Sequence, residues 1–204
     1  MWGSLTLPCE ISACLIHPGP SNTIVDRLFL IGPMGAGKTA IGRELARLLG
    51  REFIDTDHEI ERRTGVDIPL IFDKEGEAGF RRRERQVIEE LSQKQNIVLA
   101  TGGGVVLDPA NRACLQKRGF VIYLKASVNA QSNRTGHNPR RPLLTAENRE
   151  ERLQELFMVR EPLYESIAQL TIITDRGRVN RLALHIQQEL EKRAPVSINA
   201  SRTS

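Results

Sequence analysis

The residues from Gly32 to Thr39 have the types and the spacing of a phosphate-binding loop. They match the pattern G-x-x-x-x-G-K-[ST] at every specified position. Glycines in such a loop let backbone N–H groups turn toward phosphate oxygens, and the helix that follows adds the positive end of its dipole. Lys38 would reach the β- and γ-phosphates, and the Thr39 hydroxyl would coordinate Mg²⁺. The segment therefore predicts a site for a nucleoside triphosphate.

The loop also has the flanking elements that this motif requires. An apolar run at 27–31 predicts a buried strand before it, and residues 39–49 carry apolar side chains at helical spacing after it, with Gly50 as a stop. A glycine-rich turn that binds nothing is the alternative, and these two elements argue against it. The nucleotide contacts are expected from Gly35, Ala36, Gly37, Lys38, Thr39 and Ala40.

Two acidic residues, Asp55 and Asp57, follow the next apolar segment at 53–54. In an extended backbone, alternation would point both side chains the same way. One carboxylate near Mg²⁺ and one near an acceptor hydroxyl is a division of roles that suits phosphoryl transfer. The alternative is that Asp57 caps a helix that begins at His58.

Three consecutive glycines, Gly102, Gly103 and Gly104, follow an apolar strand expected at 97–100. Glycines at the end of a strand allow the backbone to approach a ligand closely. The preceding Thr101 stands where many phosphate-loop enzymes have an Asp, which leaves Thr39 and Asp55 as the expected metal ligands. An ordinary tight turn is the alternative.

Arginines supply positive charge at three further places. Arg81 is expected near the beginning of a helix, where Glu84 three residues later can orient its guanidinium. A solvated basic face is expected for Arg83 and is the alternative for Arg82. The segment 133–142 mixes glycine, prolines and three arginines without a regular period, which suits either a lid over phosphates or a plain surface loop. Arg160 is expected near a helix end, just before Pro162.

Composition and patterning predict a single α/β domain. Lys and Arg exceed Asp and Glu by 29 to 25 in 204 residues, a mild excess that suits anionic small molecules and is too weak to indicate nucleic acid. Three sparse cysteines favour a reducing cytoplasm over a disulfide framework, and no apolar run approaches the ~20 residues that span a bilayer. Strand and helix signals alternate, which favours a parallel sheet with ligands at its C-terminal edge.

The chain is expected to have a flexible extension at 1–26, a domain at 27–193 and a flexible tail at 194–204, with a lid at about 133–146. The remaining strands are expected at 120–124 and 170–173. The further helices are expected at 78–93, 109–117, 147–159 and 178–192.

Taken in order, these motifs resemble shikimate kinase over about residues 28–190. The phosphate loop is shared by many families, whereas the remaining motifs are more specific. They are Asp55-Thr-Asp57, Phe80-Arg81 with Glu84, Gly102–Gly104, Arg141-Pro-Leu-Leu144 and Arg160-Glu-Pro-Leu-Tyr164.

The resemblance implies that MgATP phosphorylates the 3-hydroxyl of shikimate, in the pathway to chorismate and aromatic amino acids. It implies the P-loop NTPase fold of nucleoside monophosphate kinases, with a five-stranded parallel sheet flanked by helices and a lid. By the same resemblance Asp57 orients the hydroxyl and takes its proton. Arg81 and Arg160 grip the shikimate carboxylate, and Gly102 to Gly104 face the substrate.

On the nucleotide side, the resemblance implies that Arg141 reaches the transferring phosphoryl group and acts in catalysis with Lys38 and Asp57. Arg134 would stack on adenine. Some family members have a proline in the late adenine-side loop, where this chain has Val179, and Arg178 is expected to contact the nucleotide there.

Two other functions compete with this interpretation. Another kinase of the same fold, such as gluconate kinase or a nucleoside monophosphate kinase, explains the phosphate loop but not the acidic, glycine and arginine motifs together. A nucleotide-binding regulator would be expected to lack Lys38, Asp57 or the lid arginines, and all are present. We expect a monomer that binds ATP, Mg²⁺ and shikimate, with no nucleic-acid or membrane partner.

Overall fold

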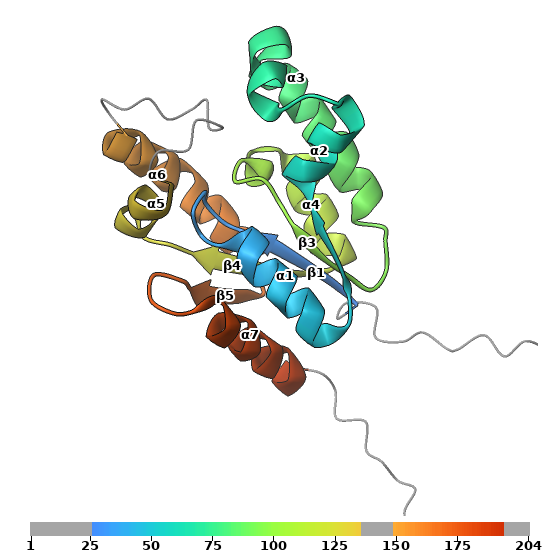
Figure 1. The fold of residues 1–204 in the computed structure, drawn as a ribbon, viewed down its shortest axis with the longest axis vertical. Coiled ribbons are helices and arrows are strands. Elements are labelled where there is room, and N and C mark those ends of the chain that lie inside the picture. Colours follow the sequence, from blue (N-terminus) through green and yellow to red (C-terminus); the bar gives the residue numbers. More distant parts are fainter. Residues whose placement is uncertain (1–25, 136–148, 194–204) are drawn as a thin grey trace, which may run out of the picture.

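The structure is a computed structural model that describes residues 26–135 and 149–193. In these ranges five parallel strands form one sheet in the order β2-β3-β1-β4-β5 (Figure 1). The strands are β1 Arg27–Ile31, β2 Glu52–Asp55, β3 Ile97–Ala100, β4 Phe120–Lys125 and β5 Leu170–Ile173. The predicted five-stranded parallel sheet is confirmed.

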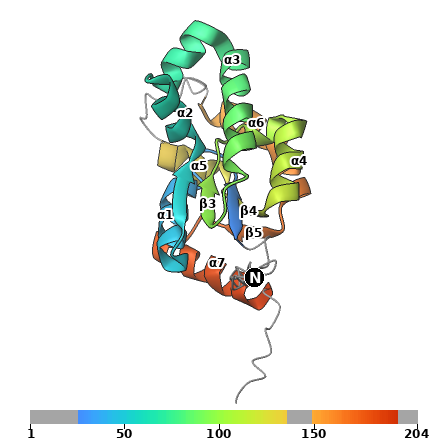
Figure 2. The ribbon, with the colours of Figure 1, turned by 90° about the vertical axis from the view of Figure 1, so that its right-hand side faces the viewer.

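Helices cover both faces of this sheet (Figure 2). They are α1 Lys38–Leu49, α2 Thr56–Thr64, α3 Ile68–Leu91, α4 Pro109–Arg118, α5 Val128–Thr135, α6 Arg149–Ile167 and α7 Val179–Arg193, with a 3-10 turn η1 at Val105–Leu107. Within the described ranges, none of them combines the length and the apolar character needed to cross a membrane.

Alternation along the central strand β1 creates two hydrophobic cores. Leu28 and Leu30 pack with α1 and α7 on one face, whereas Phe29 and Ile31 pack with α2, α3, α4 and α6 on the other. All four side chains are fully buried. Burial on both faces explains why the strand is a continuous apolar run rather than an alternating one.

Strand register brings the sequence motifs to one edge of the sheet. Ala100 pairs with Leu30 on one side and with Asp55 on the other, so β1, β2 and β3 end at nearly the same level. The phosphate loop, the acidic pair and the triple glycine leave these three strand ends. Parallel strands with helical crossovers therefore place all three motifs in one crevice.

Two predicted helices have different bounds in the structure. Helix α3 begins at Ile68 rather than at 78, because the Asp67 carboxylate caps it by accepting from the N–H of Leu70 at 3.1 Å. Gly76, with φ +68°, interrupts it, and the predicted start lies just beyond this break. Arg81 is consequently inside a helix and not at its beginning.

Helix α6 continues through Pro162 to Ile167, although the prediction ended it at 159. Proline removes one backbone N–H and disfavours the helix. Here Tyr164 and Ile167 are buried against the sheet, and this packing keeps the last two turns helical. Arg160 therefore lies in the helix interior, which corrects its expected position at a helix end.

Several predictions concern residues outside the described ranges. The expected extension is described only at Asp26, and the expected tail at 194–204 is not described. Of the expected lid, residues 133–135 belong to α5, and the rest, including Arg141, lies outside the described residues.

Candidate active site

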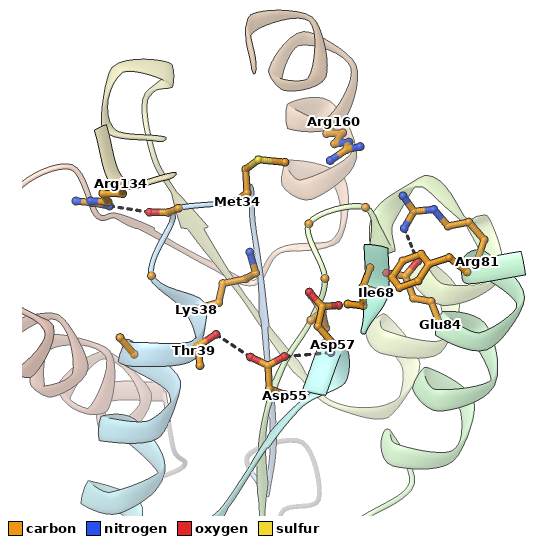
Figure 3. A pocket seen from close by; sticks show the side chains of 18 of the residues that line it. Met34, Lys38, Thr39, Asp55, Asp57, Ile68, Arg81, Glu84, Arg134 and Arg160 are labelled. Carbon is orange, nitrogen blue, oxygen red and sulfur yellow. Dashed lines mark hydrogen bonds and ion pairs between the residues drawn. The ribbon is translucent and has the colours of Figure 1, made fainter. Parts of the chain in front are cut away.

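A cavity of about 450 Å³ opens at the carboxyl ends of β1, β2 and β3 (Figure 3). Its lining comes from the phosphate loop, the start of α2, helix α3, the glycine segment, α5 and α6. The lining residues are Met34, Gly35, Gly37, Lys38, Thr39, Ala40, Asp55, Asp57, Ile68, Phe72, Phe80, Arg81, Glu84, Thr101, Gly102, Gly103, Gly104, Arg134 and Arg160.

The phosphate loop has the backbone geometry expected of an anion site. Gly35 and Gly37 have φ values of +75° and +90°, which residues with a β-carbon rarely adopt. Gly37 precedes α1 and has no side chain to cap it, so the first N–H groups of the helix are left for a ligand. The Lys38 ammonium group donates to the carbonyls of Gly32 at 2.7 Å and Pro33 at 2.8 Å, which holds it across the loop.

Asp55 joins the phosphate loop to the acidic motif. Its Oδ2 accepts a 2.7 Å hydrogen bond from the Thr39 hydroxyl, and its Oδ1 accepts from the backbone N–H of Asp57 at 3.0 Å. Asp55 is thus the N-cap of α2, which begins at Thr56. The alternative that Asp57 is the cap is therefore excluded. The expected extended segment is corrected, because Asp57 lies in the first helical turn. Both carboxylates still line the cavity.

Close approach of side chains explains two of the three glycines, Gly102 and Gly104. A β-carbon on Gly102 would lie 2.8 Å from Oδ1 of Asp57 and 2.8 Å from Oε1 of Glu84, and one on Gly104 would lie 2.3 Å from Nη2 of Arg81. The φ of Gly104 is −95°, so backbone strain is not the reason for glycine at that position. At Gly102 and Gly104, glycine is therefore explained by the close approach of side chains that line the cavity. A β-carbon on Gly103 would meet no atom closer than the backbone nitrogen of Met34, at 3.4 Å.

Arg81 is oriented by carboxylates of its own helix. Its Nη1 donates to Glu84 Oε2 at 2.6 Å and its Nη2 to Glu77 Oε1 at 3.0 Å. The expected contact with Glu84 is therefore present. Glu84 is fully buried, and its other oxygen has no hydrogen-bond partner among the described residues. Burial raises the pKa of Glu84, against the opposing effect of the Arg81 and Arg160 charges.

Arg160 enters the cavity from α6, and in Figure 3 it lies on the same side of the cavity as Arg81. Its side chain is nearly buried, with 6% relative exposure. Its Nε has no hydrogen-bond partner among the described residues. A guanidinium desolvated in this way favours an anionic ligand, which would supply the missing hydrogen bonds.

Arg134 bridges the phosphate loop and the segment after β5. Its Nη1 donates to the carbonyl of Gly35 at 3.1 Å, and its Nη2 donates to the carbonyls of Thr174 at 2.5 Å and Asp175 at 3.1 Å. Arg178 is exposed and is not among the residues that line the cavity; its carbonyl accepts from the first N–H groups of α7. Ala36 is buried beneath the loop and does not line the cavity either.

Comparison with known proteins agrees with this geometry. The sequence model of the shikimate kinase family matches residues 34–191. The chain belongs to the shikimate kinase family. A shikimate kinase from Acinetobacter baylyi is 53% identical over 169 residues, which are 83% of this chain and 94% of that protein. The predicted family, fold and enzyme class are confirmed.

Two further relatives extend this likeness. A shikimate kinase from Methylococcus capsulatus is 59% identical over 159 residues, which are 76% of this chain and 89% of that protein. The solved structure of shikimate kinase from Acinetobacter baumannii in complex with shikimate has a TM-score of 0.82 at 49% identity, and the match covers 85% of this chain and 97% of that one.

The cavity of this shikimate kinase-family chain also has an apolar wall, which was not predicted from the sequence. The wall consists of Met34, Ile68, Phe72 and Phe80, and the two phenylalanine rings have centroids 4.9 Å apart. Ile68 and Phe72 were missed because α3 was predicted to begin ten residues too late. Asp67 followed by Ile68 and a proline is a helix-start signal that could have found them.

Proposed function

We propose that this chain transfers the γ-phosphoryl group of MgATP to the 3-hydroxyl of shikimate, giving shikimate 3-phosphate and ADP. One observation carries the proposal: a single cavity has the phosphate loop with Lys38 at one side and two inward-facing guanidiniums, Arg81 and Arg160, at the other. In Figure 3, Asp57 lies between Lys38 and Arg81. The aromatic-amino-acid pathway role is that of the family, and the relative solved in complex with shikimate supports the choice of acceptor.

The acceptor side suits a small hydroxylated carboxylic acid. Arg81 and Arg160 would bind its carboxylate through charge-assisted hydrogen bonds, which are stronger than neutral ones and are directional. Three residues of the apolar wall, Ile68, Phe72 and Phe80, would pack against the carbon ring. Asp57 would accept a hydrogen bond from the reacting hydroxyl and take its proton as the new oxygen–phosphorus bond forms.

The donor side suits a magnesium–nucleotide complex. The Thr39 hydroxyl and the Asp55 carboxylate lie 2.7 Å apart and offer the oxygen ligands that Mg²⁺ prefers. No group of three or more metal-binding side chains occurs in the described residues, which fits a cation held mainly by phosphate oxygens and water. When bound, Mg²⁺ neutralises phosphate charge. We infer that Asp55 and Thr39 are its protein-side ligands.

Lys38 and backbone N–H groups of the loop would hold the β- and γ-phosphates in line with the acceptor hydroxyl. Phosphoryl transfer needs mainly alignment and charge neutralisation, because its transition state is loose. The bond from the γ-phosphorus to the bridging oxygen breaks, and ADP leaves with that oxygen. Arg134 would contact the adenine. Arg141, outside the described residues, keeps its sequence-based role at the transferring group, and Arg178 is a weaker candidate because it is exposed.

We also propose that the enzyme is a monomer and that it is cytoplasmic. Sparse cysteines support a reducing compartment, and the described residues of one chain already bring both halves of the cavity together. Size-exclusion chromatography with light scattering tests the oligomeric state. A mass near 22.9 kDa is expected, and a mass of twice that value would contradict it.

The deciding experiment is ADP release with MgATP and shikimate, gluconate or AMP, each offered separately beside a reaction without acceptor. We expect turnover with shikimate alone. Lys38→Met is the matched control for contaminating ATPases, and it should lower turnover by at least ~100-fold while the protein stays folded, because it removes a charge from the transition state. Turnover with gluconate or AMP would reject the assigned acceptor, and ADP release without any acceptor would reject transfer altogether.

A further inference from the structure

Tyr164 links α6 to the glycine segment of the cavity. Its side chain is fully buried, and its hydroxyl donates a hydrogen bond to the carbonyl of Gly103. On the other side, the N–H of Gly102 donates to the Thr56 hydroxyl at 3.0 Å. The glycine backbone is therefore attached to the start of α2 by one hydrogen bond and to α6 by another.

Tyr164 is also one helical turn beyond Arg160. Residues four apart lie on the same face of a helix, so the hydroxyl that holds Gly103 and the guanidinium that lines the cavity belong to one rigid unit. The Nε of Arg160 has no hydrogen-bond partner among the described residues, but the Arg160 side chain interacts with the Tyr164 phenol through a hydrogen bond and through its charge. The position of the guanidinium therefore depends on Tyr164 and on how α6 packs. Burial raises the pKa of the Tyr164 phenol, which keeps it a neutral donor at physiological pH.

We propose that Tyr164 is a positioning residue for substrate binding: its hydroxyl sets the distance between the glycine backbone and Arg160. This inference rests on the proposed function, in which both groups contact shikimate. Without the hydroxyl, the Gly103 carbonyl loses its hydrogen bond to α6, and the seating of the helix beside the glycines is less well defined. The consequence would be weaker binding of the carboxylate, whereas the hydrogen bonds that hold Lys38 across the phosphate loop do not involve Gly103.

The chain supplies a matched control for this hydroxyl. Tyr123 on β4 is also fully buried, and its ring stacks on that of Tyr164 with centroids 5.0 Å apart and planes 22° apart. The Tyr123 hydroxyl is buried but has no hydrogen-bond partner among the described residues. Tyr123→Phe and Tyr164→Phe therefore remove the same atom from the same core, and only the second removes a bond to the glycine segment.

The test compares these two variants with the wild type. Tyr164→Phe should raise the KM for shikimate about tenfold, the effect of one lost hydrogen bond, with a smaller change in kcat and a KM for ATP within about twofold. Tyr123→Phe should match the wild type in all three constants. A merely structural role would lower the thermal stability and change both KM values alike, and that result would overturn the inference. So would identical behaviour of the two variants.

A second measurement tests whether Tyr164 acts through Arg160. Tyr164→Phe is added to Arg160→Lys and, separately, to Arg81→Lys, and kcat/KM for shikimate is measured for each. We expect a loss well below tenfold in the Arg160→Lys background and the full loss in the Arg81→Lys background. Equal losses in both would overturn the inference. A wild-type protein that does not use shikimate would instead reject the proposed function, and the inference with it.

Discussion

The Thr39 hydroxyl donates to the Asp55 carboxylate at 2.7 Å, and this hydrogen bond joins the first turn of α1 to the end of β2. The two residues are 16 positions apart in the chain and come from different motifs. The other oxygen of Asp55 caps α2 through the N–H of Asp57. One carboxylate thus sets the spacing between the proposed metal ligands and the proposed acceptor-side acid.

Substitutions of Asp55 should separate its two roles. Asp55→Asn retains an oxygen that can cap α2 and removes the charge, so we expect a nearly unchanged melting temperature together with a higher Mg²⁺ requirement for turnover. Asp55→Ala removes both the capping oxygen and the charge, and it should also destabilise the protein by about 1 kcal/mol. Thermal unfolding and Mg²⁺ titration of activity measure the two effects. An unchanged Mg²⁺ requirement in both variants would show that Asp55 does not serve the metal.

Arg81→Lys should be costly even though the charge is retained. Lysine cannot reproduce a planar fork that binds Glu84 and a substrate carboxylate together. We expect kcat/KM for shikimate to fall by at least ~10-fold with little change in the KM for ATP. Arg83→Lys, two positions away and paired at the surface with Glu75, is the control and should match the wild type. Equal kinetics for the two variants would remove Arg81 from the carboxylate site.

Adding a β-carbon within the glycine segment should have position-dependent effects. At Gly104 the new methyl group would lie 2.3–2.6 Å from the Arg81 guanidinium and would displace it. Gly104→Ala should therefore raise the KM for shikimate more than Gly103→Ala, whose β-carbon has no neighbour closer than 3.4 Å. Steady-state kinetics of the two alanine variants decide this, and a larger effect at Gly103 would contradict the close approach of Arg81.

The loss of stability on acidification should depend in part on Glu59, in the first turn of α2. Hydrogen bonds from Arg62, reinforced by Arg63, lower the pKa of Glu59 from its ordinary 4.5 to about 2. A carboxyl with a lowered folded-state pKa stabilises the fold above its unfolded pKa, and this contribution is lost as the pH falls through the folded pKa. Glu59→Gln should thus lower the melting temperature at pH 7, and the difference from wild type should shrink between pH 4.5 and about 2.

Melting temperatures across that pH range check this expectation. Glu155→Gln is the control, because its ion pair with Arg152 is exposed on both sides and screened by solvent. We expect it to leave the melting temperature almost unchanged at every pH. A gap between Glu59→Gln and wild type that stays constant down to pH 2 would contradict the linkage.

The sequence alone determined the phosphate loop, the parallel sheet and the family. Gly32 to Thr39 and the apolar strands are local patterns, and such patterns largely determine the local backbone. The glycines of the loop predict the positive φ at Gly35 and Gly37, and the continuous apolar run predicts that β1 is buried on both faces. Because parallel strands end at one edge of a sheet, the sequence was sufficient to assign Asp55, Asp57 and Gly102 to Gly104 to one crevice.

Only the tertiary structure decided how these groups contact one another. The passage of α6 through Pro162 depends on packing that overrides local propensity. Glu84 contacts Gly102, which is 18 positions away in the chain. Tyr164 contacts Gly103, which is 61 positions away. Such contacts follow from how helices seat on the sheet, which no short sequence pattern encodes.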